Sequence, residues 1–453
     1  MNTHLDNKSH SSNIDEQLPN NDIGGNKTLT IKEYLSEENL PLPEEDETGL
    51  DSAYSYVVLF ASFMNFIVIF GCFNAFGIFQ EYYLNTQFAD KPATDIAWIS
   101  TIALSVSLSG GIFGSPIIAR IGIRRTFILG SIVATLGLAL ASFSTKSIAL
   151  LTITQGLVFG FGGSIIINGS ILMPSLWFKK HRSLAIGIVS SGSGFGGMVM
   201  GPIIETTLRK VGIEWSFRIL CFITLAFTLT ASIVLKPRAS GFKTSSKKIF
   251  NFSLLKKPYT IFLCIGGFFA ELGYTVLSLY FASTVVSIGQ SRSTASNTIL
   301  AFSAASGISR LASGYYAKWF GPNTTLIFAM TASSILMFSM WLPSKSFPVY
   351  YTFFILCGFL CALFFPLGPV MIANNYDVGE VSQVNGVVYL FYGASTLVGN
   401  PLLGLMFDKI GNRTSYNSVI IAGGISFLIS GIVLFFQRIY SRKYMPNLKT
   451  GKI

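Results

Sequence analysis

Charged residues are scarce in this sequence. Only 12% of its 453 residues are Asp, Glu, Lys or Arg, whereas soluble domains carry about 25%. Hydrophobic residues make up 51%, which is more apolar surface than a soluble fold of this length can hide. The shortage of charge therefore argues against an ordinary soluble domain and indicates a chain that keeps much of its surface against lipid.

Histidine and cysteine are also scarce. The three histidines, His4, His10 and His181, form no catalytic or metal-binding constellation with any other residue in the sequence. The five cysteines all lie in apolar stretches, so no disulfide framework is indicated. Cys357 and Cys361 are one helical turn apart, but no His or acid lies near them, and we interpret them as small packing residues rather than a metal pair. No cofactor and no metal site are predicted.

A nucleotide-binding motif of the form G-x-x-x-x-G-K-[ST] is absent, which argues against ATP-driven pumping. A membrane enzyme needs a cluster of His, Asp or Cys near an interface. The sequence has no such cluster, so no enzyme activity is predicted. The net charge is +11, but the basic residues lie in short loops between apolar runs. This pattern reports membrane orientation rather than nucleic-acid binding. The predicted partners are a small-molecule substrate and the lipid bilayer, with protons as a further hypothesis.

The acidic residues are concentrated at the start of the chain. Residues 1–53 carry twelve acids and three lysines, and the other 400 residues carry 29 Lys and Arg but only nine acids. This polar start lacks the basic and apolar parts of a signal peptide. We predict a disordered acidic tail in the cytosol over 1–53. A solvating role is favoured over the alternative of a docking or turnover segment.

Twelve apolar segments follow, each long enough to cross a hydrocarbon core of about 30 Å. The fold class predicted is all-α, with 12 transmembrane helices in two six-helix bundles, over 54–236 and 259–437. A basic linker over 237–258 and a basic tail over 438–453 complete the chain, and both are expected in the cytosol. The predicted spans are 55–79, 96–119, 126–143, 148–174, 184–207, 216–236, 259–285, 295–317, 324–342, 348–373, 383–407 and 418–437.

The loops predict the orientation. With the amino terminus inside, the inner loops and the final tail hold 19 Lys and Arg, and the outer loops hold eight. This excess satisfies the positive-inside rule and places both termini in the cytosol. The chain is expected to be a multi-pass membrane protein, in the plasma membrane in preference to the vacuolar membrane.

The two halves repeat one another. Gly187 precedes Pro202 by 15 residues, and Gly386 precedes Pro401 by the same number. Each half also has a basic residue beside a glycine turn at the inner face, at Arg120 to Arg125 and at Lys318 to Gly321. Internal repeats of this kind are typical of secondary transporters.

These features resemble the major facilitator superfamily over residues 54–440. The loop Arg120-Ile121-Gly122-Ile123-Arg124-Arg125 is similar to the superfamily's signature between spans two and three, although Ala119 stands where the usual acid would be. The run from Gly197 to Gly201-Pro202 is similar to its fifth-span glycine motif. The resemblance implies gating or structural roles for Arg120, Gly122, Arg124, Gly197, Gly201 and Pro202.

A narrower resemblance is to the monocarboxylate transporter family, in its fungal branch that includes riboflavin porters. The run Trp177-Phe178-Lys179-Lys180-His181-Arg182-Ser183-Leu184-Ala185-Ile186-Gly187 is similar to its fifth-span signature, and Asp51 to Tyr56 is a degenerate form of its first-span signature. The resemblance implies that the eighth-span arginine, Arg310, anchors a carboxylate. Lactate carriers of that family have an acid at the position of Ser306 and a basic residue at that of Asn74, so their mechanism is not expected here.

Only two charges are expected deep inside spans, Glu271 and Arg310. A charge at mid-helix costs about 2.5–3.5 kcal/mol on insertion scales and needs a partner, water or a substrate. A guanidinium takes a carboxylate in a bidentate manner and stays charged, which suits an anion site. The alternative is a structural ion pair of Arg310 with Glu271. Our hypothesis for Glu271 is proton coupling.

Four further residues are substrate-binding candidates, because polar groups in an apolar span need partners. They are Asn74, Asn168, Tyr389 and Tyr392. The function predicted is secondary active transport of a small organic solute by alternating access, with a monocarboxylate-like anion or a riboflavin-like substrate. The alternatives are a transporter-like nutrient sensor with little flux and a uniporter of a neutral solute.

Overall fold

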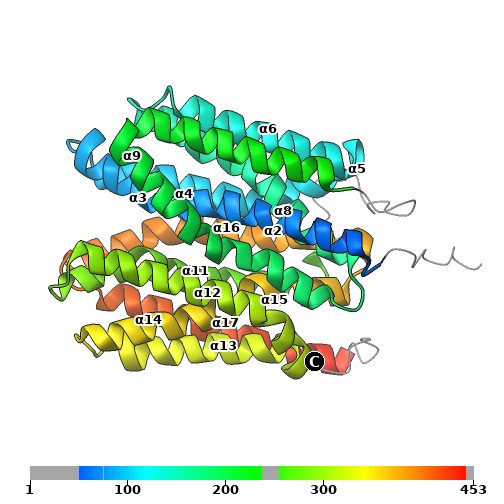
Figure 1. The fold of residues 1–453 in the computed structure, drawn as a ribbon. Helices are drawn as coiled ribbons and strands as arrows, with labels where there is room; N and C mark the ends of the chain where they lie inside the picture. The colour runs from blue at the N-terminus through cyan, green and yellow to red at the C-terminus, as the bar shows by residue number, and fades with distance from the viewer. Residues whose placement is uncertain (1–49, 75, 237–254, 445–453) are drawn as a thin grey trace, which may run out of the picture. The chain divides into compact units, whose positions relative to one another are not determined.

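The computed structural model describes residues 50–74, 76–236 and 255–444, and these residues form helices and short connections with no strand. The predicted acidic tail over 1–53, the linker over 237–258 and the tail over 438–453 lie largely outside the described residues. The two groups of helices expected from the sequence are visible in Figure 1 as the blue-to-green and green-to-red parts of the ribbon.

The amino-terminal helices pack mainly around α9, which contacts α2, α6 and α8. Two of the amino-terminal spans contain single π-helical segments, η1 and η3, and the second span contains a 3₁₀ turn, η2. These elements are α2 (Ala53–Asn74), α3 (Phe76–Tyr82), η1 (Tyr83–Gln87), α4 (Ala93–Ser109), η2 (Gly110–Phe113), α5 (Gly114–Ile121), α6 (Ile123–Ala141), α7 (Ile148–Leu151), η3 (Thr152–Val158), α8 (Phe159–Trp177) and α9 (Arg182–Val234).

The carboxy-terminal helices pack in a similar way, with α11 against α16 and α17 and α12 against α14. The tenth span consists of α14 and α15, which join through two residues with helical φ and ψ. These elements are α11 (Pro258–Ser287), α12 (Arg292–Phe320), α13 (Pro322–Leu336), η4 (Met337–Trp341), α14 (Phe347–Cys361), α15 (Phe364–Asn375), α16 (Val378–Lys409) and α17 (Asn417–Tyr444).

The predicted layout of twelve spans fits this structure. Ten helical stretches of the described residues are long and apolar enough to cross a membrane. One of them, α9, covers 53 residues and contains a single non-helical residue, Gly212, with φ 81°. The predicted connection between the fifth and sixth spans is therefore reduced to one glycine, because glycine adopts positive φ without a steric penalty. The eighth span is α12, a 29-residue helix that is not among these ten because it contains many polar residues.

The two predicted glycine turns have the same geometry. Gly122 ends α5 with φ 82°, and Gly321 ends α12 with φ 83°. Four residues later, the hydroxyls of Thr126 and Thr325 each donate to the preceding glycine carbonyl at 2.8 Å. Positive φ explains why both positions are glycine. The repeat of the sequence is therefore also a repeat of local structure.

Glycines at one constant spacing bring the two bundles into contact. Gly194 on α9 and Gly393 on α16 are 199 residues apart, as are Gly122 and Gly321. A Cβ on Gly194 would lie 2.6 Å from the Cα of Gly307 on α12, and one on Gly393 would lie 2.4 Å from the carbonyl oxygen of Ser105 on α4. We call these two contacts between bundles the α9–α12 seam and the α4–α16 seam. Only glycine permits such close backbone approach.

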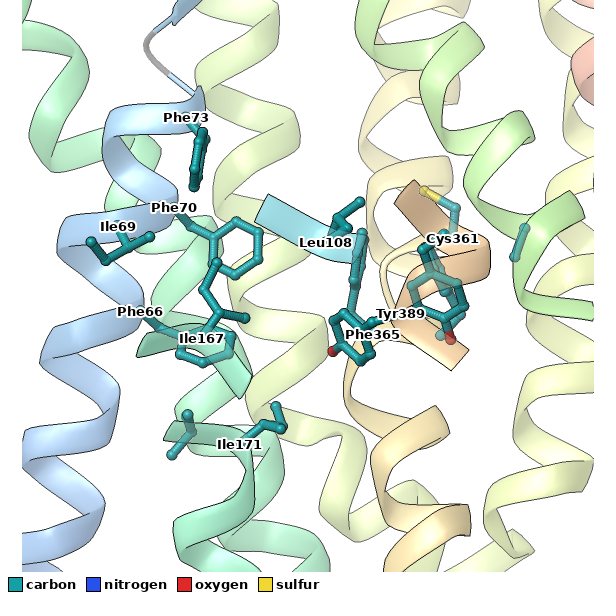
Figure 2. Packing of buried hydrophobic residues seen from close by; sticks show 14 of the residues in the cluster. Phe66, Ile69, Phe70, Phe73, Leu108, Ile167, Ile171, Cys361, Phe365 and Tyr389 are labelled. Atoms are coloured by element: carbon teal, nitrogen blue, oxygen red, sulfur yellow. The ribbon is translucent and has the colours of Figure 1, made fainter. Parts of the chain in front are cut away.

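Hydrophobic side chains fill the interior between these helices. Figure 2 shows Phe66 and Phe70 of α2 near Ile167 of α8, and Phe365 and Tyr389 of the carboxy-terminal bundle a short distance away. All five side chains are at most 9% exposed. The buried polar residues Arg310, Glu271 and Asn168 therefore lie in surroundings where an unpaired polar group is costly.

Candidate functional site

Arg310 is the buried charge at the α9–α12 seam. Its helix, α12, places it within an all-helical interior, where only 3% of the residue is exposed. One terminal nitrogen donates a hydrogen bond to the hydroxyl of Ser193 on α9, and Nε has no hydrogen-bond partner. The guanidinium carbon lies 4.2 Å from the centroid of the Phe365 ring, in cation–π contact. The described ion pairs include none with Arg310.

Ser193 joins Arg310 to a second sequence candidate, Asn74. The side-chain amide of Asn74, on α2, donates to the backbone carbonyl of Ser193 at 2.9 Å. A Cβ on the neighbouring Gly197 would lie 3.3 Å from the side chain of Asn74. The serine therefore receives a hydrogen bond from each bundle, through its hydroxyl and through its carbonyl.

Glu271 lies on α11 and is 6% exposed. One carboxyl oxygen accepts a hydrogen bond from the hydroxyl of Thr396 at 3.3 Å, and the other oxygen has no partner. Glu271 and Arg310 lie within electrostatic range of each other, but no ion pair joins them among the described residues. Each group therefore retains an unpartnered polar atom, and the structural ion pair that we weighed as an alternative is not formed.

Aromatic side chains surround these two charges. The ring centroids of Tyr389 and Tyr392, both on α16, lie 5.0 Å apart. The ring centroids of Tyr274 and Phe365 lie 5.3 Å apart. Arg310 lies within electrostatic range of Tyr274 and Tyr389. The structure thus groups four of the sequence candidates, Arg310, Glu271, Tyr389 and Tyr392, on the carboxy-terminal side of the site.

The tenth span lies near Arg310. Helix α14 ends at Cys361 and α15 begins at Phe364, and the two residues between them, Ala362 and Leu363, keep right-handed helical φ and ψ. The hydroxyl of Ser309, next to Arg310, donates to the carbonyl of Phe359 in the last turn of α14. This hydrogen bond joins the residue beside Arg310 to the tenth span.

Asn168 has different contacts. It lies on α8 with 5% of the residue exposed, and its amide donates to the carbonyl of Ser164 at 3.0 Å, while its carbonyl oxygen has no partner. A Cβ on Gly111 would lie 1.9 Å from the Asn168 side-chain nitrogen. Asn168 therefore packs against the α4–α16 side of the interior, and no described contact joins it to Arg310.

The basic residues of the loop signature lie at the protein surface. Arg120 and Arg124 flank the Gly122 turn, are exposed, and form no ion pair with another described residue. Ala119 supplies no carboxylate to hold them.

The fifth-span glycines divide into two groups. The closest approach of α2 to α9 falls on Gly192 and Gly196, where a Cβ would lie 2.7 Å and 2.4 Å from backbone oxygens of α2. Gly201 has only Ile78 nearby, at 3.9 Å, and Pro202 lies within the continuous helix α9. The tight contact with α2 therefore falls on Gly192 and Gly196, and not on Gly197 and Gly201.

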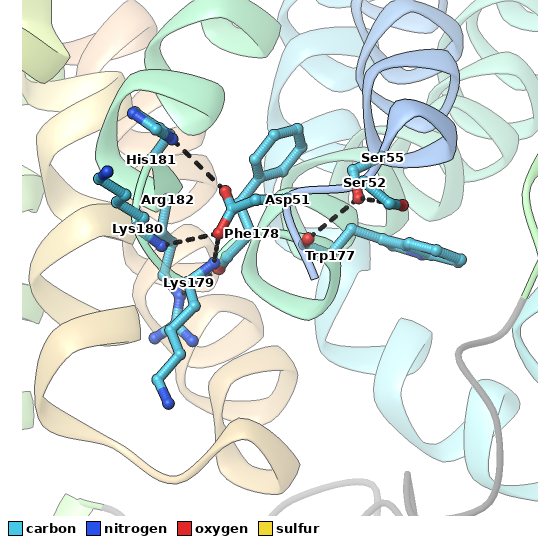
Figure 3. Close-up of polar contacts among 9 residues, drawn as sticks. All are labelled: Asp51, Ser52, Ser55, Trp177, Phe178, Lys179, Lys180, His181 and Arg182. Atoms are coloured by element: carbon cyan, nitrogen blue, oxygen red, sulfur yellow. Dashed lines mark hydrogen bonds and ion pairs between the residues drawn. The ribbon is translucent and has the colours of Figure 1, made fainter. Parts of the chain in front are cut away.

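The fifth-span signature lies at one end of the site's helices, and Figure 3 shows its polar contacts. The Asp51 carboxylate accepts backbone hydrogen bonds from Lys179 and Lys180 at 3.3 and 3.1 Å and lies 3.5 Å from His181. Burial raises the pKa of Asp51, but these hydrogen bonds outweigh it and hold the pKa below its usual value. Arg182 reaches the other bundle, donating to the carbonyl of Ala373 at 2.9 Å.

Sequence reasoning missed Ser193 and Thr396, which hold Arg310 and Glu271. Serine and threonine are frequent in apolar helices, so their type alone gives no signal. Nothing in the sequence distinguishes Phe365 from the other phenylalanines, of which the chain has 40 in all. The spacing of glycines along α9 was the available signal for Ser193, because it follows Gly192 on the face that meets both α2 and α12.

Comparison with known proteins agrees with this architecture. The model of the Major Facilitator Superfamily matches residues 61–265 and 263–451. An MFS-type transporter of Gibberella moniliformis is 26% identical over 371 residues, covering 81% of this chain and 88% of that protein. The agnestins efflux protein AgnL12 of Paecilomyces divaricatus is 29% identical, with 87% and 88% covered, and the probable transporter MCH2 of Saccharomyces cerevisiae is 27% identical, with 93% and 87% covered.

Solved structures show the same fold. The transporter FucP in the outward conformation aligns with a TM-score of 0.66 at 13% identity, covering 84% of this chain and 99% of that one. The proton:xylose symporter XylE aligns with a TM-score of 0.65 at 13% identity, covering 87% and 96%. With two six-helix bundles, two glycine seams and a family match over most of its length, this multi-pass membrane chain belongs to the Major Facilitator Superfamily of transporters.

Proposed function

We propose that this transporter carries a small organic anion of the monocarboxylate type by alternating access, with Arg310 as the carboxylate anchor. The observation that carries the proposal is the state of Arg310, which is buried at the seam between bundles with an unpartnered Nε and no carboxylate partner among the described residues. A buried guanidinium without a counter-ion is costly. A substrate carboxylate would supply both the charge and the bidentate acceptor.

The surrounding residues fit such a substrate. Phe365 covers one face of the guanidinium, and Tyr274 and Tyr389 lie nearby, so the organic part of the anion would meet aromatic surface. Asn74 reaches the same place through Ser193 and would help to fix the substrate. A larger flat substrate of the riboflavin type would use the same aromatic rings.

Proton coupling through Glu271 is the second part of the proposal. Glu271 is buried, has one unpartnered oxygen and lies within electrostatic range of Arg310. Protonation would remove its charge as the substrate anion arrives or leaves. The solved structures that share the fold include a fucose:proton and a proton:xylose symporter, which supports proton coupling as the energy source.

We further propose that both termini face the cytosol and that the protein lies in the plasma membrane. The excess of Lys and Arg in the predicted inner loops supports this orientation. Arg182 and the Asp51 contacts would then close the cytosolic end in this structure. The divisions at 54–236 and 259–437 would be the two moving bundles.

Uptake into proteoliposomes under an imposed inward proton gradient tests the proposal. Labelled short monocarboxylates and riboflavin would be offered to the wild type and to Arg310→Ala. We expect gradient-driven uptake of one substrate, reduced at least a hundredfold in the variant because a buried ion-pair partner is lost, about 3–5 kcal/mol. Arg310→Lys is the matched control, since it keeps the charge but loses the bidentate geometry.

The outcomes separate the parts of the proposal. Uptake that is indifferent to the gradient would indicate a facilitator and remove Glu271 from the mechanism. Uptake that survives in Arg310→Ala would refute the anchor. If no offered compound enters, the proposed substrate class is wrong.

A further inference from the structure

Ser193, on α9 of the amino-terminal bundle, is hydrogen-bonded both to the proposed anchor Arg310 and to a neighbouring helix of its own bundle. Its hydroxyl accepts from Arg310 on α12, and its backbone carbonyl accepts from Asn74 on α2. We propose that Ser193 is an internal stand-in for substrate: it occupies Arg310 while the site is empty, and an arriving carboxylate displaces it and thereby releases the α9–α12 seam. This inference rests on the proposed function, because it gives the proposed anchor a second role.

The chemistry favours displacement by an anion. A serine hydroxyl has one donor and two acceptor lone pairs, and the Ser193 hydroxyl also donates to the carbonyl of Ser190 at 2.8 Å. It can therefore offer Arg310 a single neutral acceptor. A carboxylate offers two charged oxygens, and charge-assisted hydrogen bonds are roughly twice as strong as neutral ones. The unpartnered Nε of Arg310 would gain its missing acceptor in the exchange.

Ser193 is not free to follow the arginine. Asn74 holds its carbonyl from α2 at 2.9 Å, and the next residue, Gly194, lies against the backbone of Gly307. When Arg310 turns toward a substrate, the contact to Ser193 must break rather than shift. The hydrogen bond between Arg310 and Ser193 therefore acts as a lock, in the sense that it holds α9 and α12 together beside the site until a substrate breaks it.

This lock lies at the seam that must part. Near Arg310 the seam is otherwise built from close glycine packing, including Gly187 against the carbonyl of Arg310. Contacts between glycine backbones carry no net charge, so their strength would not change when an anion binds. The Arg310 to Ser193 bond is the contact there whose strength depends on what else the guanidinium binds. Substrate binding and seam opening are coupled through it.

Ser193→Ala tests the inference, because it removes the hydroxyl and leaves the carbonyl that Asn74 uses. In proteoliposomes with labelled acetate and pyruvate, we expect KM to fall about three- to tenfold, since one net hydrogen bond no longer competes with the substrate. Ser193→Thr keeps a hydroxyl and should restore the wild-type KM. Ser190→Ala makes the same change one turn earlier, at a hydroxyl without a hydrogen-bond partner, and should leave KM unchanged.

A second readout does not need transport. Spin labels on exposed positions of the seam helices, at Met198→Cys on α9 and Ile308→Cys on α12, report the separation of the bundles. Without substrate, we expect Ser193→Ala to shift the distance distribution toward wider separations, and Ser190→Ala to match the wild type.

The results distinguish the two proposals. A KM that rises in Ser193→Ala would make Ser193 a substrate ligand, and an unchanged KM with unchanged distances would show that no lock exists; either result overturns the inference. If the wild type transports neither anion, the proposed function fails for these probes, and the distances in the empty protein still decide whether Ser193 locks the seam.

Discussion

The two seams between the bundles share their glycine spacing and differ at the position of Arg310. Gly187 and Gly194 serve the α9–α12 seam, and Gly386 and Gly393 serve the α4–α16 seam at a spacing of 199 residues. The same spacing relates Arg310 to Gly111. One seam therefore carries a buried guanidinium where the other has no side chain at all.

The difference shows how a repeated scaffold becomes a one-sided site. On the α4–α16 side, neutral hydrogen bonds span the seam, such as that from Ser105 to the carbonyl of Gly393 at 2.8 Å. The space over Gly111 is used by Asn168. Backbone packing is common to both seams, whereas charge is confined to one. Substrate recognition can therefore change at one seam without altering the geometry that both seams share.

Gly194→Val is expected to have the largest effect on the seams. The added Cβ would meet the Cα of Gly307 at 2.6 Å, and backbone cannot move aside as a flexible side chain can. We expect the α9–α12 seam to be forced apart and uptake to fall at least tenfold, at equal amounts of folded protein in the membrane. Gly393→Val, which meets the Ser105 carbonyl at 2.4 Å, should cause a similar loss. Gly404→Val, with open space around it, is the control, and normal transport by Gly194→Val would show that the seam does not need close contact.

Glu271→Gln removes the ionisable carboxyl from the carboxy-terminal side of the site. The amide cannot ionise, so proton-driven accumulation should fall about tenfold or more while exchange of labelled for unlabelled substrate continues. The hydrogen bond from Thr396 can be retained, which limits the structural effect. Full accumulation in the variant, measured under the same pH gradient, would remove Glu271 from coupling.

Gly111→Ala tests the space on the neutral side. Its Cβ would meet the side-chain nitrogen of Asn168 at 1.9 Å, and that side chain must move. We expect a loss of about 1–3 kcal/mol of folding free energy from overpacking. Adding Asn168→Ala should recover most of it, giving a coupling energy in a double-mutant cycle. Additive losses, measured by thermal unfolding in detergent, would contradict the contact.

A smaller effect is expected for the hydrogen bond between Asn400 and Thr101, which crosses the α4–α16 seam at 2.9 Å. Asn400→Ala and Thr101→Val should each cost about 0.5–1.5 kcal/mol, the usual range for a neutral hydrogen bond. Uptake rates should change less than in Ser193→Ala, because no substrate competes for this bond. A larger change in KM than at Ser193 would reverse our assignment of the two seams.

The smallest effect is expected at Asp51, outside the seams. Its folded-state pKa is lowered, so its ionised form stabilises the fold above the unfolded pKa and loses that contribution as the pH falls through the folded value. Asp51→Asn should therefore cost under about 1 kcal/mol at neutral pH and nothing in acid. Thermal midpoints measured across this pH range check the sign, and a variant that is less stable only in acid would contradict it.

Much of the fold could be predicted from the sequence, because the lengths of the apolar segments and the positions of glycine and proline determine where the spans lie. The shorter third and ninth spans correspond to α6 and to α13 with η4. The glycine turns at Gly122 and Gly321 followed from their basic neighbours and their repetition. The single-residue connection at Gly212 could not be predicted, since one glycine is a weak break in a 53-residue helix.

The candidate site was only partly predictable. Arg310 and Glu271 stand out because charges are rare in apolar spans. Whether they pair depends on the relative rotation of α11 and α12, which no local pattern fixes. The same holds for Ser193, whose role depends on which face of α9 meets α12. The polarity of α12 was itself a signal, since the helix least suited to lipid is the one that carries the arginine.

The constant spacing of the repeat also bears on how such a chain can evolve. From the glycine turn to the proline there are 80 residues in each half, Gly122 to Pro202 and Gly321 to Pro401. One residue inserted within a helix of this block would turn the remainder of that helix by about 100°, since 3.6 residues make a turn. The glycines beyond the insertion would then leave the seam. An insertion or deletion within a helix of this block should therefore disturb the seams more than most single substitutions do, which limits the routes by which such a chain can change.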